Sequence, residues 1–210
     1  MGWSDFRDNE ETRWEKAAAK SEGVADCAIS GALRSYFLVY LPVGVILITG
    51  IGFGASAPLL GDFDADWPDA LSIGAMLAGF GAMVGGLIYY GKRVRPLVRR
   101  QNMSVIFYLT DSENKDIRRQ ISGRSPVSPG LLSVVRAAAV QLRQGLAMQL
   151  HISPGFLLFY GVQVMRLCGG GISWGIRLLL SGVMACLTVA IAVQFHKTSL
   201  FLEHTAPSAR

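Results

Sequence analysis

The chain has 210 residues, 51% of them hydrophobic, and a mean hydropathy of +0.37, which is high for a soluble domain. Its net charge of +5 is unevenly spread, because segments 1–34 and 58–69 are acidic whereas segment 91–151 holds eleven Lys and Arg against three Asp and Glu. These properties exclude an ordinary soluble globular domain and predict an integral membrane protein with one basic segment.

The N-terminal segment 1–34 predicts a short cytosolic helix, with Glu10 and Glu11 near its start and Lys16 and Lys20 near its end, as the helix dipole prefers. The alternative is a frayed polar tail. No early apolar region with a small-residue cleavage site precedes the first span, so we expect that span to act as a signal anchor.

Four apolar windows are long enough to cross a hydrocarbon core of roughly 30 Å, which needs about 20 helical residues. They cover residues 36–57, 70–90, 152–171 and 176–196. This order predicts an all-α integral membrane fold with four transmembrane helices in two hairpins, 35–90 and 152–196, followed by a tail at 197–210. Pro42 is expected to bend the first span, and Ser153 with Pro154 is expected to cap and start the third.

Basic residues near the spans predict the orientation, since positive charge is retained on the cytosolic side. The connection 58–69 has four aspartates and no Lys or Arg, so it is expected outside, and segment 91–151 is expected inside. Both termini are then expected in the cytosol, and the chain is expected to be a multi-pass protein of the plasma membrane.

Small residues recur at four-residue spacing along the spans, a pattern that lets membrane helices pack closely. The stripes are Gly50 and Gly54; Gly74, Ala78, Ala82 and Gly86; Gly81 and Gly85; and Gly182, Cys186 and Ala190. They predict helix contacts within one chain or between copies in a homo-oligomer.

A run of cations directly follows the second span. It contains Lys92, Arg93, Arg95, Arg99 and Arg100. Such a cluster attracts anionic lipid at about 1 kcal/mol per residue, so we hypothesise a contact with anionic lipid or a protein partner. The alternative is that the run only fixes topology.

The basic segment 91–151 predicts a cytosolic helical hairpin between the second and third spans. Thr110 and Glu113 have capping-box spacing and predict a helix over residues 111–122, with Ile117 and Ile121 on one apolar face and Gly123 after its end. Ser128 and Pro129 predict the start of a second helix. Its apolar face is formed by Leu131, Val135, Ala138, Leu142 and Leu146, and its polar face by Arg136, Gln141, Arg143 and Gln144.

One part of this segment resembles the cytosolic hairpin of small multi-span integral membrane proteins of actinobacteria. The resemblance rests on Leu109-Thr110-Asp111, Arg118-Arg119, Pro126-Val127 with Pro129, and then Leu132, Val135, Ala138 and Ala139. It covers residues 109–143 and implies a membrane protein with a helical hairpin, without implying an activity.

The predicted outer face gathers charges of both signs. Asp62, Asp64 and Asp66 resemble the opening of a calcium loop, but Trp67 stands where such a loop needs glycine and Ile73 where it needs glutamate. Solvated loop carboxylates are therefore favoured over cation binding, with Asp66 or Asp69 capping the second span. A second hypothesis is a charge latch, in which one of the four aspartates, Asp62, Asp64, Asp66 or Asp69, pairs with Arg166 or Arg177, against simple snorkelling of the arginines.

No residue set in the sequence favours catalysis, a cofactor or a metal. The histidines His151, His196 and His204 have no ligand partner at metal spacing and are expected to be exposed or snorkelling, and the cysteines Cys27, Cys168 and Cys186 form no disulfide framework. We expect a non-enzymatic membrane component, accessory, assembly or regulatory. The alternative is a small transporter or channel subunit acting as an oligomer; nucleic-acid binding is disfavoured because Phe107 and Tyr108 are not interleaved with the cations.

Overall fold

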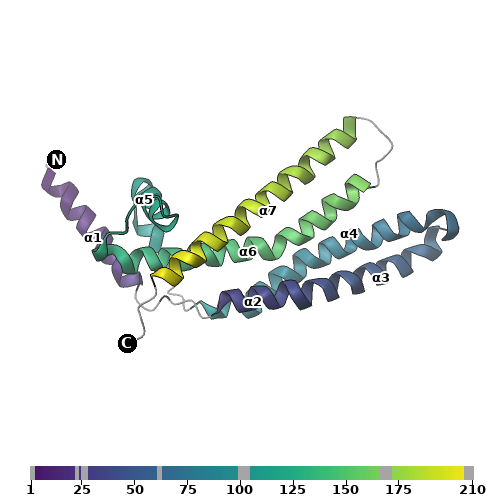
Figure 1. The fold of residues 1–210 in the computed structure, drawn as a ribbon, viewed down its shortest axis with the longest axis horizontal. Coiled ribbons are helices and arrows are strands. Elements are labelled where there is room, and N and C mark those ends of the chain that lie inside the picture. The colour runs from purple at the N-terminus through teal and green to yellow at the C-terminus, as the bar shows by residue number, and fades with distance from the viewer. Residues whose placement is uncertain are drawn as a thin grey trace. The chain divides into compact units, whose positions relative to one another are not determined.

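The computed structural model describes residues 3–21, 24, 28–60, 63–98, 105–165 and 172–205, and within these ranges the regular elements are helical (Figure 1). The α-helices are α1 (Trp3–Ser21), α2 (Ile29–Ser35), α3 (Leu41–Leu60), α4 (Phe63–Tyr89), α5 (Asp111–Ile121), α6 (Leu132–Met165) and α7 (Ile172–His204). Two π-helical turns, η1 (Tyr36–Tyr40) and η2 (Tyr90–Val94), and three 3-10 turns, η3 (Arg95–Leu97), η4 (Val105–Tyr108) and η5 (Pro129–Leu131), join them.

Four helical stretches are long and apolar enough to cross a membrane. They are Ile29–Ser56, Trp67–Leu97, Leu132–Val164 and Gly175–His204. The predictions of an all-helical fold and of four such helices are confirmed for the described residues, which are compatible with a multi-pass membrane protein. The arrangement of these helices as transmembrane hairpins stays a prediction.

The chain divides into two compact units. The apolar unit comprises Ser30–Arg95 and Ala147–Ala192, and the polar unit comprises Met1–Ile29, Pro96–Leu146 and Val193–Arg210. Each is described by itself below.

Helices α3 and α4 run side by side in the apolar unit (Figure 1). Their backbones meet at two glycines, since a Cβ built on Gly52 would lie 2.7 Å from the Gly74 Cα. The Ser56 hydroxyl donates to the Ala70 carbonyl oxygen at 3.3 Å and so joins the same two helices nearer their connected ends. Close approach of this kind is how helices associate where no water drives packing.

Each π-helical turn precedes a proline. In η1 the Leu41 N–H donates to the Tyr36 carbonyl and Pro42 follows, and in η2 the Arg95 N–H donates to the Tyr90 carbonyl and Pro96 follows. A proline ring collides with the carbonyl four residues earlier in an α-helix, and a wider turn relieves that collision. Pro42 is thus accommodated by a π turn at the start of the first span.

The prediction that Ser153 and Pro154 start a new helix is wrong, because α6 continues through both. Pro154 has no N–H to donate to the Leu150 carbonyl. The Ser153 hydroxyl lies 3.2 Å from that carbonyl oxygen and 3.0 Å from the Gln149 carbonyl oxygen, so it donates where Pro154 cannot. This replacement lets one helix contain both the second predicted cytosolic helix and the third span.

The predicted outer loop 58–69 is largely helical, which corrects the sequence interpretation. Helix α3 extends to Leu60 and α4 begins at Phe63, so Asp66 and Asp69 lie inside α4 and neither is its N-cap. The apolar pattern predicts only the part of a helix that lies in hydrocarbon. It does not detect polar turns that continue the same helix beyond the apolar window.

In the polar unit α5 forms as predicted. The Thr110 hydroxyl accepts from the Glu113 N–H at 3.5 Å and the Glu113 carboxylate accepts from the Thr110 N–H at 2.6 Å, which completes the capping box. Ile117 and Ile121 are buried, and Gly123 ends the helix at a φ of +73°, a conformation that favours glycine.

The start of α6 differs in detail from the prediction. Ser128 makes no side-chain cap, and Pro129 opens the 3-10 turn η5 that leads into the helix. Arg143 and Gln144, expected on a polar face, are buried. The Arg143 guanidinium lies 5.0 Å from the centre of the Phe195 ring, so an aromatic side chain of α7 covers it.

Candidate functional site

Three cations of the basic run are exposed at the end of α4. Lys92 and Arg93 lie on the π turn η2 and Arg95 opens η3, whereas Val94 between them is fully buried. The turn therefore buries the Val94 side chain and leaves the cations exposed. Arg99 and Arg100 lie outside the described residues.

The predicted stripe on α4 is buried along its length. A methyl group built on Gly74 would collide with the Thr49 carbonyl of α3, and one on Gly86 would collide with the His151 carbonyl of α6. Ala78 and Ala82 between them are buried. The stripe is thus a contact face within the chain, with one end against α3 and the other against α6.

The predicted small-residue stripes of α3 and α7 are exposed, unlike the stripe from Gly74 to Gly86 on α4. Gly50 and Gly54 are exposed and a Cβ on either would meet nothing within 4 Å, whereas Gly52, which the spacing pattern leaves out, makes the α3 contact. Gly182 and Cys186 on α7 are exposed as well. These two faces contact no residue of the described chain closely at their glycines.

A buried histidine joins three helices of the apolar unit. His151 of α6 is fully buried, contrary to the expectation of an exposed or snorkelling side chain, whereas His196 and His204 are exposed as expected. Its ring centre lies 4.5 Å from that of Tyr36 and 5.6 Å from that of Tyr89, with the Tyr89 ring stacked. The apolar unit thus places one residue from each of η1, α4 and α6 in a single ring cluster.

Hydrogen bonds join the polar groups of this cluster to backbone carbonyls. His151 Nδ1 lies 2.6 Å from the Ala147 carbonyl oxygen, which can only accept, so Nδ1 is the donor. Nε2 is buried without a hydrogen-bond partner among the described residues. The Tyr36 hydroxyl lies 3.3 Å from the Ala82 carbonyl oxygen and 3.1 Å from the His151 carbonyl oxygen, so it bridges α4 and α6.

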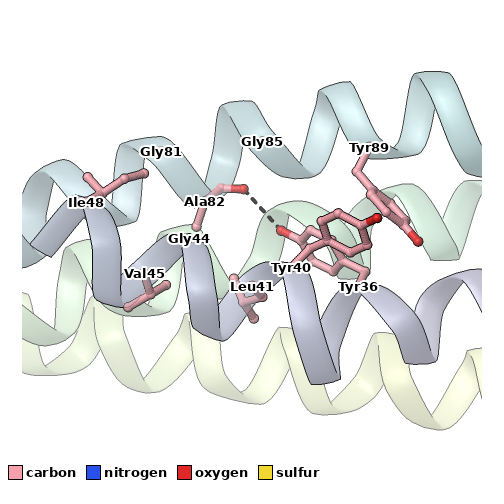
Figure 2. A pocket seen from close by; sticks show the side chains of 10 residues that line it. All are labelled: Tyr36, Tyr40, Leu41, Gly44, Val45, Ile48, Gly81, Ala82, Gly85 and Tyr89. Atoms are coloured by element: carbon pink, nitrogen blue, oxygen red, sulfur yellow. Dashed lines mark hydrogen bonds between the residues drawn. The ribbon is translucent and has the colours of Figure 1, made fainter.

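Beside this cluster a slot opens between α3 and α4, with a cavity volume of about 220 Å³. Figure 2 shows tyrosine rings gathered at one end of the slot and small or aliphatic residues at the other. The Tyr89 hydroxyl donates to the Ala32 carbonyl at 3.1 Å, and the Tyr36 hydroxyl to the carbonyls named above. The slot therefore offers mostly apolar surface.

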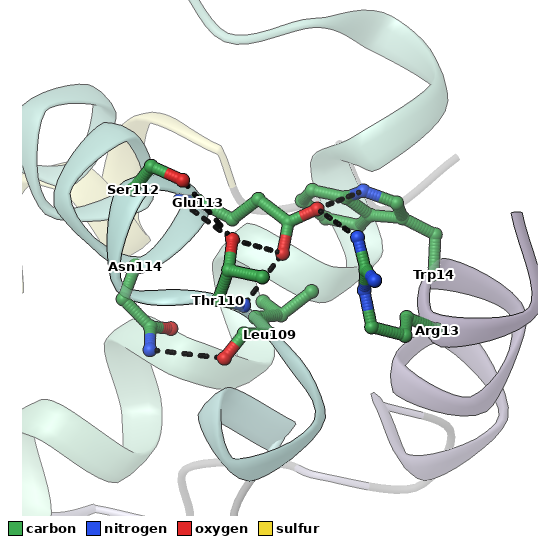
Figure 3. Close-up of polar contacts among 7 residues, drawn as sticks. All are labelled: Arg13, Trp14, Leu109, Thr110, Ser112, Glu113 and Asn114. Carbon is green, nitrogen blue, oxygen red and sulfur yellow. Dashed lines mark hydrogen bonds and ion pairs between the residues drawn. The ribbon is translucent and has the colours of Figure 1, made fainter. Parts of the chain in front are cut away.

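In the polar unit Glu113 connects two distant segments (Figure 3). Its carboxylate accepts from the Trp14 indole N–H at 3.1 Å and lies 3.5 Å from the Arg13 guanidinium. Burial alone would raise the pKa of Glu113, but hydrogen bonds from Thr110 and the charge of Arg13 outweigh it, so the pKa lies below its ordinary value of 4.5. The cap of α5 thereby anchors α1.

The charge-latch hypothesis stays untested. Asp62 and Arg166 lie outside the described residues, as do the side chains of Asp64 and Asp66. Asp69 is exposed on α4 and Arg177 is partly exposed on α7. Among the described residues, no group of three His, Cys, Asp or Glu side chains is placed to hold a metal ion.

Sequence reasoning missed the ring cluster and the slot. Tyr36 and Tyr89 lie at the ends of predicted spans, where the apolar pattern gives no sign of a contact between them. His151 lies just outside a predicted span, so its polarity alone assigned it to the surface. A usable signal was the small residue Gly86 at the end of the α4 stripe, because a gap there admits the backbone of another helix.

The chain was compared with protein-family models, with curated proteins and with solved structures, and nothing matches it in any of the three. The resemblance of residues 109–143 to actinobacterial hairpins therefore stays a prediction.

Proposed function

We propose that the chain is a non-enzymatic, multi-pass protein of the bacterial plasma membrane, with both termini in the cytosol, that acts as an accessory, assembly or regulatory component. In this role the basic segment 91–151 contacts a protein partner or anionic lipid.

One observation carries the proposal: Lys92, Arg93 and Arg95 are exposed together at the end of an apolar helix. Exposed cations at this position are within reach of anionic headgroups or of an acidic protein surface. Cations that pair with carboxylates of their own chain would be poorer contacts of either kind.

The folded polar unit supports a role beyond topology. A topogenic signal requires only positive charge beside a span. Glu113, by contrast, ties the capped helix α5 to Arg13 and Trp14, about a hundred positions away in sequence. A segment that serves only to orient the spans needs no such tertiary contact.

Purification of the full chain in mild detergent, with mass spectrometry of co-purifying proteins and lipids, tests the proposal. The triple variant Lys92→Gln, Arg93→Gln, Arg95→Gln is expected to lose the specific partner. A matched variant, Lys115→Gln, Arg118→Gln, Arg124→Gln, removes the same charge from other exposed positions and is expected to keep it. Equal loss of the partner in both triple variants would mean that overall positive charge, and not the position of the basic run, determines the contact.

Orientation is tested separately by cysteine labelling on intact cells. A membrane-impermeant maleimide is expected to label a cysteine at Ala65 and to miss one at Ser112, in a background without the native cysteines. Labelling at Ser112 from outside would reverse the topology and remove the cytosolic role of the basic segment.

A further inference from the structure

Three tyrosines and three glycines are among the residues that line the slot between α3 and α4. Tyr36, Tyr40 and Tyr89 surround one end, and Gly44, Gly81 and Gly85 line its length (Figure 2). A Cβ built on Gly44 or Gly85 would meet nothing within 4 Å, whereas one on Gly81 would collide with the Ile48 side chain. The absence of side chains at Gly44 and Gly85 therefore keeps the slot open.

The shape and chemistry of the slot suit a narrow hydrocarbon. Its volume of about 220 Å³ is below the roughly 300–1,000 Å³ typical of pockets for compact ligands. The hydroxyls of Tyr36 and Tyr89 already donate to backbone carbonyls, so the lining presents mainly ring and aliphatic surface. Both walls belong to helices long and apolar enough to cross a membrane, where the surrounding solvent is lipid acyl chain.

A cation follows the tyrosine end of the slot in the sequence. The α4 residues that line the slot are Gly81, Ala82, Gly85 and Tyr89. Three of these, Gly81, Gly85 and Tyr89, are spaced by four, and Arg93 on the π turn η2 is the next position in that register. It lies about one helical turn, or ~5 Å, beyond Tyr89 and is exposed. Arg95 is exposed too but falls outside the register.

We propose that the slot binds one acyl chain of an anionic phospholipid from the bilayer, with the lipid phosphate held by Arg93. Apolar lining and adjacent positive charge together select this class of lipid over a neutral one. The inference deepens the proposed function by naming a ligand for the basic run, and it rests on that proposal only in requiring that the chain is embedded in a membrane.

Native mass spectrometry of the full chain, with phosphatidylglycerol or phosphatidylcholine added, tests the inference. The wild type is expected to retain one phosphatidylglycerol in preference to phosphatidylcholine. Gly44→Leu and Gly85→Leu fill the slot and are expected to abolish this retention. Gly50→Leu and Gly54→Leu place the same side chain in open space elsewhere on α3 and are expected to leave it unchanged.

The headgroup contact is tested by two charge variants. Arg93→Gln is expected to weaken phosphatidylglycerol binding about fivefold, the equivalent of about 1 kcal/mol per basic residue. It is expected to weaken phosphatidylcholine binding less, because the choline cation offsets the charge of that lipid's phosphate. Arg95→Gln removes the same charge at a position outside the four-residue spacing of the slot-lining residues, and it is expected to weaken phosphatidylglycerol binding less. Equal weakening by both would overturn the assignment to Arg93.

Photocrosslinking gives a readout that needs no variant to fold. A phosphatidylglycerol with a diazirine on its acyl chain is expected to label peptides covering residues 36–48 and 81–89. Labelling spread evenly over all four apolar helices, or equal retention by the filled and control glycine variants, would overturn the inference.

The two proposals fail separately. If the filled variants keep the lipid while the triple charge variant loses a protein partner, the slot inference is wrong and the proposed function stands. If the filled variants lose the lipid while the triple charge variant keeps every partner that the wild type has, the inference holds and the proposed role of the basic run in partner contact is wrong.

Discussion

Replacement of Ser153 tests how α6 remains one helix. The Leu150 carbonyl has no N–H partner at Pro154, and the Ser153 hydroxyl lies 3.2 Å from its oxygen. Ser153→Ala removes that donor, whereas Pro154→Ala restores a backbone N–H to the same carbonyl. The two changes should therefore couple: Ser153→Ala destabilises the native chain but has little effect in the Pro154→Ala background.

The size of the coupling follows from the surroundings of Ser153. Its side chain is buried in the apolar unit, so water cannot replace the lost donor, and an unpaired buried acceptor costs about 1–3 kcal/mol. The hydroxyl proton is shared with the Gln149 carbonyl at 3.0 Å, and hydrogen bonds between membrane helices average about 0.6 kcal/mol. We therefore expect a coupling free energy of about 1 kcal/mol.

Equilibrium unfolding in mixed micelles of rising SDS fraction, followed by far-ultraviolet circular dichroism, measures the four free energies of this cycle. Ser72→Ala is the matched control, because the Ser72 hydroxyl also donates to a carbonyl three residues earlier, at 2.9 Å, but no proline follows it. The control is expected to cost little. An equal cost of Ser153→Ala with and without Pro154 would refute the account of helix continuity.

Three further outcomes are expected. Gly86→Ala should destabilise by about 1–3 kcal/mol in the same unfolding assay because its methyl group collides with the α6 backbone, while Gly85→Ala, which meets open space, should be neutral or stabilising; equal effects would contradict the packing. The lowered pKa of Glu113 adds stability that is present above the ordinary carboxyl pKa of 4.5 and is lost as the pH falls through the lowered value. Below about pH 4.5 the wild type should therefore lose more thermal stability than Glu113→Gln does. If the charge latch exists, Arg166→Asp should lower thermal stability in detergent. Adding Asp69→Arg, or reversing the charge of a neighbouring aspartate, should then restore part of the lost stability. Double variants that recover nothing beyond the sum of the single changes would exclude the latch.

Local patterns predicted the features that local physics decides. The capping box needs only Thr110 and Glu113 at the right spacing, and Gly123 needs only the positive φ that ends the helix, so α5 could be placed from sequence. The four-residue spacing from Gly74 to Gly86 on α4 likewise puts these small residues on one face before any partner is known, and that face is buried. The second predicted stripe on α4 is not buried along its length, because Gly85 is exposed.

Features decided by distant segments could not be read in this way. Gly50 and Gly54 have the motif spacing, yet Gly52 makes the contact, because the inward face of α3 is set by where α4 crosses it. Arg143 is charged, a property that predicts a solvent-exposed side chain. Its guanidinium is nevertheless covered by the ring of Phe195, about fifty residues later. His151 is polar, and its burial depends on distant segments that place the rings of Tyr36 and Tyr89 against it.

The prolines show how a local feature acts on a distant one. Pro96 is accommodated by the π turn η2, in which Val94 is buried while Arg93 is exposed in register with Tyr89. Pro42 is accommodated by η1, which presents Tyr36 to both α4 and α6. A π turn spaces its own side chains around the helix axis differently from an α-helix, so the turns that accommodate the two prolines affect which residues face the cluster and the slot. Tyr36 and Tyr40 at one end of the proposed lipid site and Arg93 beyond it therefore lie on π turns that precede prolines.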